Sequence, residues 1–374
     1  MTTKPIGLYV HIPFCKSKCA YCDFVSFAGA IEEYGERYTK ALVREIYSYK
    51  RDPKIKADTV FFGGGTPTVL PTEFFREIVT AIRDAFEIMP DTEFTLEANP
   101  KTLTDEKLSA YTSLGVNRIS LGLQSFCENE LKILGRIHNF DDFCTSYEMC
   151  KKYGISNINV DVMYALPTQS AGTLARTLSE VIALSPTHVS AYSLILEEGT
   201  ALHRDREKLV FPTEDEECEM YELITDRLAR AGYSHYEISN YARAGYESRH
   251  NLKYWRDEEY IGLGLAAHSY FDRKRYSNPE TFSEYFSLCG REYLQCENID
   301  ADTQAYEYAM MRLRLSEGFS LSEYKELFGR DFLSGKEAYI SSLIKNGYLT
   351  VSNKRIALTE KGFYVSNEIL CRIL

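Results

Sequence analysis

Short apolar runs alternate with longer amphipathic stretches over the first half of the chain, and this alternation limits the possible folds most. The apolar runs predict buried strands at Leu8–Ile12, Thr59–Phe62, Glu93–Leu96, Arg118–Leu123, Ile158–Tyr164 and Val189–Ile195. Strands that alternate with helices pair in parallel through right-handed crossovers. Six such units predict a partial or complete α/β barrel, which carries its active site at the carboxyl ends of the strands.

The amphipathic stretches predict the connecting helices. The clearest has apolar residues at steps of three or four from Ile31 to Tyr49, with charged residues on the opposite side. Four more helices are predicted at Thr72–Phe86, Asp105–Leu114, Asp141–Tyr153 and Ala171–Leu184.

A different pattern follows residue 200. The sequence predicts a helix at Asp215–Ala231, a strand at His235–Tyr241 and then a glycine-rich segment at Ile261–His268. From about Asp300, three helices and two short strands resemble a small winged-helix-like unit. We therefore expect two domains: an α/β domain over residues 1–298 and a small α+β domain over residues 299–374.

Charge and hydropathy narrow the choice of partner and compartment. The 54 acidic residues outnumber the 43 basic ones and give a net charge of −11, which repels the phosphate backbone of nucleic acids. Residues 299–374 carry ten residues of each sign, which is too neutral for a winged helix that reads DNA. No apolar run is long enough to span a bilayer and the N-terminus lacks a signal peptide, so we expect a cytosolic protein.

Three of the ten cysteines lie within eight residues. Cys15, Cys19 and Cys22 have the spacing C-x3-C-x2-C directly after the first predicted strand. In a reducing compartment such a group indicates a metal or catalysis rather than disulfides. Three thiolates on one loop can bind three irons of a 4Fe–4S cluster and leave the fourth iron open. A zinc site with His11 as the fourth ligand is the alternative.

Several motifs carry a family resemblance. In chain order they are LYVHIPFCKSKCAYCDF, FFGGGTPT, LEANP, GLQSF, LGRIH and NVDVMYALPTQ. This ordered set, which covers about residues 7–270, resembles the radical S-adenosylmethionine (SAM) proteins of the HemN/HemW group, and the tail resembles that group's C-terminal domain. The resemblance implies a partial (β/α)6 radical-SAM barrel and a 4Fe–4S cluster held by Cys15, Cys19 and Cys22. It further implies that SAM binds the open iron and is cleaved to methionine and a deoxyadenosyl radical when a donor reduces the cluster.

The resemblance also assigns cofactor contacts. They are Tyr9, Tyr21, Gly64, Gly65, Thr66, Glu97, Gln124, Arg136 and Asp161. Glycines at 63–65 let the backbone approach a ligand, although a tight turn is the alternative reason for them. Carboxylate and amide oxygens of Glu97, Gln124 and Asp161 can accept hydrogen bonds from an ammonium group or ribose hydroxyls. Hydrogen bonds within the barrel are the alternative for these three, and Arg136 is expected to pair with the SAM carboxylate.

Two branches share these motifs: the oxygen-independent coproporphyrinogen III oxidases and the HemW-type haem chaperones. The oxidases have a fourth cysteine two residues after the third and an N-terminal extension. Here Phe24 stands at the position of that cysteine, and eight residues precede Tyr9. The chaperones have the motif H-N-x-x-Y-W, which this chain carries from His250 to Trp255.

His250 is the candidate axial ligand for haem, because a neutral imidazole binds haem iron well and the adjacent rings can pack on a porphyrin. The alternative is that His250 caps a loop that Trp255 anchors to the barrel. His268 is a second candidate ligand.

We therefore expect a cytosolic haem chaperone with a 4Fe–4S cluster and SAM, and we assign no catalytic residue. The expected partners are haem, haem-requiring apoproteins and an electron donor, with a membrane surface and a second copy of the chain as further ones. The first alternative is a radical SAM enzyme that modifies a porphyrin, such as a coproporphyrinogen III oxidase. The second is a zinc-stabilised regulatory protein with a winged-helix tail.

Overall fold

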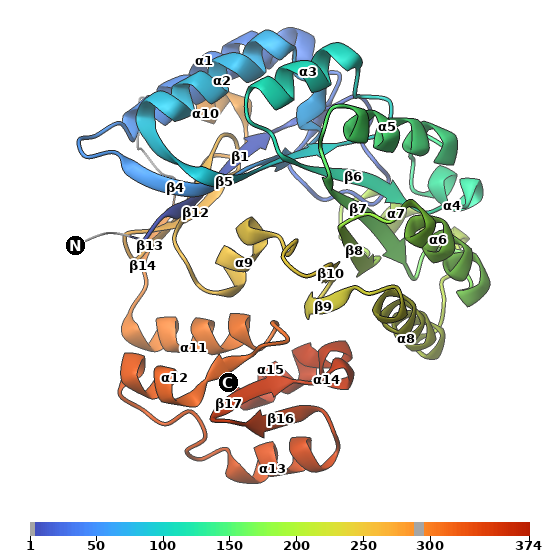
Figure 1. The fold of residues 1–374 in the computed structure, drawn as a ribbon, viewed down its shortest axis with the longest axis vertical. Helices are drawn as coiled ribbons and strands as arrows, with labels where there is room; N and C mark the ends of the chain where they lie inside the picture. Colours follow the sequence, from blue (N-terminus) through green and yellow to red (C-terminus); the bar gives the residue numbers. More distant parts are fainter. Residues whose placement is uncertain (1–3, 288–294) are drawn as a thin grey trace.

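A parallel sheet wrapped by helices forms the larger part of the computed structural model, which describes residues 4–287 and 295–374 (Figure 1). Six parallel strands lie side by side in chain order: β1 (Ile6–Ile12), β4 (Ile55–Gly64), β5 (Phe86–Ala98), β6 (Arg118–Gln124), β7 (Asn157–Tyr164) and β8 (His188–Ser193). The connecting helices are α1 (Ile31–Ser48), α2 (Thr72–Ala85), α3 (Asp105–Ser113), α4 (Glu128–Ile133), α5 (Phe140–Lys152) and α6 (Ala171–Leu184). The predicted barrel of six strand–helix units is confirmed.

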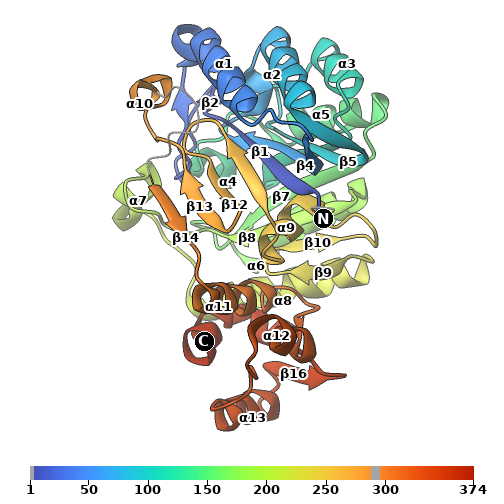
Figure 2. The same ribbon diagram turned by 90° about the vertical axis from the view of Figure 1, so that its left-hand side faces the viewer.

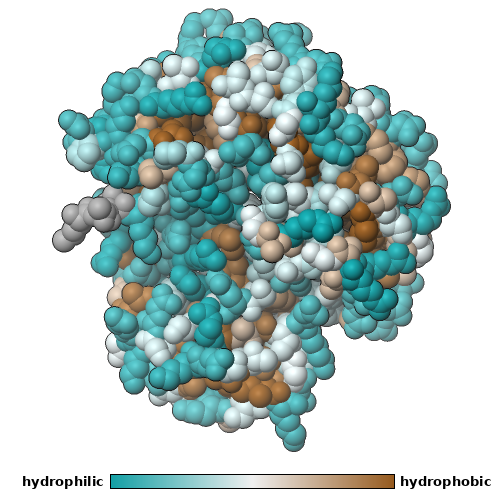
Figure 3. Space-filling view, viewed as in Figure 1, coloured by the Kyte–Doolittle hydropathy of each residue, from teal (hydrophilic) through white to brown (hydrophobic). Residues whose placement is uncertain are grey.

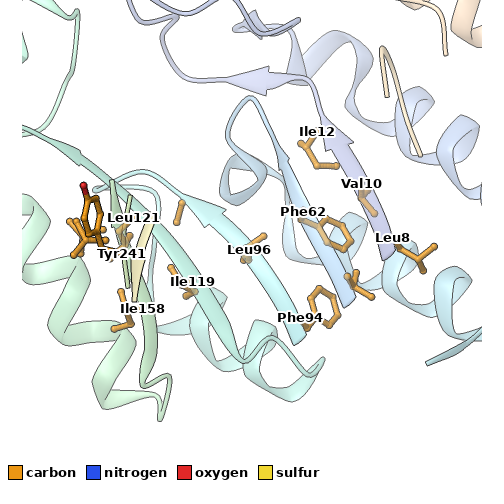
Figure 4. Close-up of a cluster of buried hydrophobic side chains, with 14 of the residues drawn as sticks. Leu8, Val10, Ile12, Phe62, Phe94, Leu96, Ile119, Leu121, Ile158 and Tyr241 are labelled. Atoms are coloured by element: carbon orange, nitrogen blue, oxygen red, sulfur yellow. The ribbon is translucent and has the colours of Figure 1, made fainter. Parts of the chain in front are cut away.

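The two faces of this curved sheet differ in chemistry because side chains alternate along each strand. The outer face is apolar and packs on the helices, as Figure 4 shows for Leu8, Phe62 and Leu96. The ring of Phe62 lies 4.8 Å from that of Phe75 on α2. The inner face is polar, so the space enclosed by the strands is suited to a polar ligand.

The sheet continues beyond the six predicted strands to twelve. The single strand expected at His235–Tyr241 is a hairpin of β9 (Ser234–Glu237) and β10 (Asn240–Ala242), which pairs antiparallel with β8. At the other edge, β11 (Tyr260–Leu263) pairs parallel with β1 and is followed by β12 (His268–Phe271), β13 (Lys274–Ser277) and β14 (Gln295–Asn298). A Cβ atom on Gly262 would lie 2.1 Å from the carbonyl oxygen of His268. The close approach of β12 therefore explains why a strand here is glycine-rich.

Helix α9 (Arg249–Trp255) contains the H-N-x-x-Y-W motif and lies against the inner face of the sheet near the amino ends of the strands (Figure 1). Ser248 caps its first turn, and the Glu93 carboxylate on β5 accepts from the backbone N–H groups of Arg249 and His250 at 3.0 Å each. The remaining elements of this part are the short pairing strands β2 (Phe14–Cys15) and β3 (Phe27–Ala28) and the helices α7 (Ala201–Arg204), α8 (Glu214–Arg230) and α10 (Phe282–Ser287).

The C-terminal residues form a separate small sheet with helices, seen below the barrel in Figures 1 and 2. Its elements are α11 (Ala301–Arg312), β15 (Phe319–Ser320), α12 (Leu321–Phe328), α13 (Glu337–Lys345), β16 (Leu349–Ser352), β17 (Arg355–Leu358), α14 (Glu360–Tyr364) and α15 (Ser366–Ile373). This part contacts the barrel through the Arg256–Glu317 ion pair (3.1 Å) and through Tyr221, whose hydroxyl donates to the Glu360 carbonyl. The predicted division between residues 298 and 299 falls between β14 and α11.

The surface shown in Figure 3 is largely hydrophilic, with apolar residues scattered between polar ones. Within residues 4–287 and 295–374, no helix has both the length and the apolar character needed to cross a membrane.

Candidate functional site

The loop that follows β1 brings the three predicted cysteines to one cavity. Cys15 ends β2, and Cys19 and Cys22 lie in the turn before β3. All three thiols are free and partly exposed, and all three line a cavity of about 590 Å³ at the carboxyl ends of the strands. This volume is in the range of sites that enclose a cofactor-sized ligand.

Hydrogen-bond donors surround the cysteine sulfurs. The Thr66 hydroxyl donates to the Sγ of Cys15 (3.6 Å), and the Arg136 guanidinium donates to the Sγ of Cys19 (3.4 Å). Burial raises the pKa of the Cys15 and Cys22 thiols. A bound metal deprotonates a ligating thiol, and nearby donors stabilise the resulting negative sulfur. The three thiols and their donors therefore fit a site for metal-bound thiolates.

His11, the fourth ligand of the zinc alternative, points elsewhere. Its Nε2 bonds the Val25 carbonyl (2.8 Å) and its Nδ1 bonds the Tyr9 hydroxyl (3.1 Å). Both ring nitrogens are thus engaged in this conformation. In the part of the chain that the structure describes, no three His, Cys, Asp or Glu side chains converge on the position of a single metal ion, as a zinc site requires. The three thiols are therefore suited to a cluster, in which each thiolate binds a different iron, rather than to one ion.

The glycine turn after β4 packs directly against the cysteine loop. Gly64 has φ +103°, and a Cβ atom there would lie 2.4 Å from the His11 ring. A Cβ atom on Gly65 would lie 2.7 Å from the Phe14 carbonyl oxygen and 3.0 Å from the Cys15 sulfur. The tight-turn alternative therefore accounts for both glycines, because a side chain would collide with the protein itself. Both residues also line the cavity.

Two carboxylates from neighbouring strands face the cavity. Glu97, at the end of β5, accepts from the backbone N–H of Gly64 at 3.2 Å. Burial, with the Asp161 charge as a second cause, raises the pKa of Glu97 to about 8. Asp161 on β7 accepts from the Asn159 amide at 2.7 Å, and burial raises its pKa as well. Near neutral pH the Glu97 carboxyl is therefore mostly protonated, and a bound cationic group would favour its ionised form.

Gln124 and Arg136 complete the polar wall. Gln124 ends β6 with φ +71°, and its amide oxygen accepts from the Tyr192 hydroxyl at 3.0 Å. Arg136 donates to the Asn99 amide oxygen (2.6 Å) and to the Gly122 carbonyl (2.7 Å). A Cβ atom on Gly122 would lie 2.6 Å from the guanidinium, so the glycine makes room for Arg136. This arginine joins the cysteine loop to the strand ends.

Known proteins match the chain over its whole length. The Radical SAM superfamily matches residues 9–181, and the HemN C-terminal domain matches residues 299–365. The "Heme chaperone HemW" of Lactococcus lactis is 36% identical over 100% of this chain and 98% of its own length. Those of Bacillus subtilis and Escherichia coli are each 34% identical, over 96% and 98% of this chain and 97% of their own length.

This chain belongs to the HemW family. The resemblance drawn from the ordered motifs is confirmed. The structure of the E. coli coproporphyrinogen III oxidase (HemN) superposes with a TM-score of 0.87 over 99% of this chain and 90% of that one, at 21% identity. That likeness shows a shared fold, including the C-terminal part.

Two predicted contacts of this HemW-family chain lie outside the cavity wall. Tyr9 is not among the lining residues; it stacks on Phe61, its partner on the neighbouring strand, with ring centroids 6.1 Å apart, and Phe61 does line the cavity. His250 is 1% exposed. Its Nδ1 bonds the Thr59 hydroxyl and its Nε2 bonds the Tyr254 hydroxyl, both at 2.8 Å. Burial, with the charge of Lys253 as a second cause, lowers the pKa of His250 to about 3.

This HemW-family cavity also has walls that the sequence analysis did not single out. Asn99, Tyr192 and Asn251 all line it. Asn99 belongs to the LEANP motif and Asn251 to the H-N-x-x-Y-W motif, so the motifs were the signal that could have identified both residues. Tyr192 follows His188 and Ser190 at steps of two on β8, and this alternation marks the inner face of the strand.

Proposed function

We propose that this protein is a haem chaperone that carries a 4Fe–4S cluster and SAM and passes haem to haem-requiring apoproteins. The observation that carries the proposal is the 31–36% identity to proteins named heme chaperone HemW over nearly the whole of both chains. The cavity supports it, because three free thiols and a polar wall meet there.

The cluster ligands are proposed to be Cys15, Cys19 and Cys22. When bound, such a cluster supplies an electron to a ligand on its open iron. The protein's own part is to hold the thiolates, and Arg136 and Thr66 donate hydrogen bonds to two of the three sulfurs. These bonds stabilise the charged sulfurs and orient the loop.

The SAM contacts are proposed to be the residues predicted from the resemblance. Cavity-lining positions support Tyr21, Gly64, Gly65, Thr66, Glu97, Gln124, Arg136 and Asp161. Tyr9 does not line the cavity and stacks on Phe61, which does, so its proposed part is to support the wall rather than to touch the ligand. The carboxylates suit the cationic and hydroxyl groups of SAM, and the guanidinium suits its carboxylate.

Haem binding by this chain is the test of the whole proposal. Haem titrated into the reconstituted protein should give a saturable Soret band. A band no larger than that of haem in buffer without protein would contradict the proposal. The role of His250 stays a prediction, because ligation of haem iron requires its ring to leave Thr59 and Tyr254. A Soret band that shifts in His250→Ala supports ligation of haem iron by this residue. An unchanged band would show that another residue is the ligand, with His268 as the next candidate.

Location and assembly also stay proposals. A cytoplasmic protein, a homodimer and peripheral membrane contact are tested by cell fractionation, light scattering and flotation with vesicles. An electron donor is required because the cluster chemistry begins with reduction.

A further inference from the structure

The cavity extends along the whole inner face of β6 and does not end below the cysteine loop. Arg118, Ser120, Gly122 and Gln124 alternate from the first residue of this strand to its last, and all four line the cavity. The residue steps between them, at about 3.3 Å each, span about 20 Å. At the far end lies α9, whose Asn251 also lines the cavity. The predicted SAM contacts lie at or near the carboxyl ends of the strands, so the end beside α9 has no ligand assigned to it.

Arg118 is a buried cation at this end. It is 2% exposed, and it lines the cavity. Its Nε has no hydrogen-bond partner, and within residues 4–287 and 295–374 its guanidinium forms no ion pair and no side-chain hydrogen bond. Arg136, the other arginine of the wall, donates to the Asn99 amide oxygen, the Gly122 carbonyl and the Cys19 sulfur. A buried charge without a partner is costly, so Arg118 requires an explanation that Arg136 does not.

The carboxyl groups of the barrel interior are committed to other partners. Glu93 accepts from two backbone N–H groups of α9 at 3.0 Å each, and Asp161 accepts from an amide of its own strand at 2.7 Å. Burial raises the pKa of Glu97 to about 8 and that of Glu237 to about 7. These two groups are therefore largely protonated near neutral pH and supply little negative charge. None of the four carboxyls forms an ion pair with the guanidinium of Arg118.

Two further hydrogen-bond donors are free beside Arg118. Thr95 is its register partner on β5, is fully buried, and has a hydroxyl without a hydrogen-bond partner. The side chain of Asn251 lines the cavity and forms no hydrogen bond to any residue that the structure describes. Free donors of this kind, gathered round a buried cation, favour an acceptor that carries negative charge.

We propose that this inner subsite, made of Arg118, Thr95 and Asn251, binds a carboxylate group. The planar guanidinium matches a carboxylate with two parallel N–H···O bonds. The hydroxyl and the amide supply further donors for the same oxygens. The bound carboxylate also brings the negative charge that the protein itself does not place next to Arg118.

Two sources can supply the carboxylate. One is a propionate side chain of haem, and the inference in this form rests on the proposed function. It is supported by α9, which carries the H-N-x-x-Y-W motif beside the subsite. After burial and the Lys253 charge, the charge of Arg118 is the third cause that lowers the pKa of His250. The other source is a free small carboxylate that enters the cavity on its own.

The first experiment uses acetate as the smallest probe and Arg118→Met as the variant. The control is Arg314→Met, because Arg314 is half-buried, lies in the C-terminal part and forms no ion pair among the described residues. Thermal unfolding of the protein without haem is compared in sodium acetate and in sodium chloride of equal concentration. A ligand that binds only the folded state should raise the midpoint of the wild type and of the control by about 2 °C or more. Arg118→Met should show no such rise.

The second experiment compares haem with its dimethyl ester, which has no free carboxylate. Arg118→Met should bind haem at least about tenfold more weakly than the wild type, as the loss of a charge-assisted hydrogen bond predicts. Its affinity for the ester should equal that of the wild type, and Arg314→Met should bind both porphyrins normally. Loss of the acetate response with unchanged haem binding would identify a free carboxylate as the occupant.

The outcomes separate this inference from the proposed function. Failure of the wild type to bind haem contradicts the proposed function, and the acetate response then decides the subsite alone. The inference is overturned if Arg118→Met changes neither the acetate response nor haem binding, or if it weakens haem and the ester equally.

Stability in chloride gives an independent check. Arg118→Met should be at least as stable as the wild type, because an apolar side chain replaces an unpaired buried cation. A variant that unfolds more easily, or does not fold, would show that Arg118 serves the protein's own structure and would overturn the inference.

Discussion

The cysteine loop gives the sharpest prediction at the scale of single residues. Replacing Cys19 by Ser should abolish the cluster, because two thiolates cannot fix a cubane with one open iron. The matched control is Cys218→Ser on α8, which is also free and partly exposed but distant in sequence from the loop. Iron and sulfide analysis after anaerobic reconstitution measures the result. A full complement of iron and sulfide in the Cys19→Ser protein would refute the assignment.

Glu97 predicts how SAM binding depends on pH. Its pKa of about 8 means that the carboxyl is mostly protonated at neutral pH and ionised above pH 8. The anion binds a cationic ligand better, so affinity for SAM should rise between about pH 6.5 and pH 8.5, by up to about tenfold per pH unit below the pKa. Titration calorimetry on the reconstituted protein gives the affinity.

The Glu97→Gln variant isolates this contribution. Its amide cannot ionise, so the part of the pH dependence that Glu97 causes should disappear while that of SAM's own groups remains. If the two proteins show the same slope against pH, Glu97 does not face the cationic part of the ligand.

The sequence was sufficient for residues whose role is local and insufficient for those whose role depends on folding. The spacing of Cys15, Cys19 and Cys22 places three thiols on one loop in almost any fold. His250 looked available for a ligand because a motif says nothing of which way a ring points. Its two partners are Thr59, 191 positions away, and Tyr254.

At the scale of elements, α9 predicts a measurable effect on stability. His250→Ala removes a buried ring and leaves the Thr59 and Tyr254 hydroxyls without their partner. We expect a loss of about 2–4 kcal/mol in the free energy of unfolding, from the lost hydrogen bonds and the cavity together. Denaturant unfolding of the His250→Ala and wild-type apoproteins gives the difference.

The control for α9 is His268→Ala on β12. His268 is exposed, and changes at exposed positions usually stay within about 0.5 kcal/mol. Equal stability of the two variants would mean that α9 does not depend on the His250 hydrogen bonds.

Elements with a strong period of their own were predictable, and elements held by distant partners were not. The stripe from Ile31 to Tyr49 predicts α1 to within one residue of its end, because amphipathic spacing is a property of the segment alone. Strand β11 was not recognisable from the sequence because it contains Gly262, a residue that is uncommon in strands. The reason for this glycine is the close approach of β12, which only the fold shows. Helix α9 begins where two of its backbone N–H groups donate to the Glu93 carboxylate on β5, a residue that is distant in the sequence.

The whole molecule makes a prediction about activity. Its fold matches that of coproporphyrinogen III oxidase, but Phe24 occupies the place of the fourth motif cysteine expected for the oxidases. We therefore expect no conversion of coproporphyrinogen III to protoporphyrinogen IX by the reconstituted protein. The assay follows protoporphyrin fluorescence after oxidation of the product. Restored growth of an oxidase-deficient strain that expresses this chain would contradict the prediction.

The cysteine loop is short. Its three thiols line the cavity, and Lys16, Lys18 and Phe24 are exposed within the same ten residues, with Lys18 and Phe24 also lining the cavity. A cluster bound by the thiols would tie positions 15, 19 and 22 together and so fix the spacing of the side chains between and beside them. In a protein without its cluster, the exposed side chains of the loop would not be held in one arrangement for an electron donor to bind. An electron donor would therefore recognise only protein that already holds its cluster.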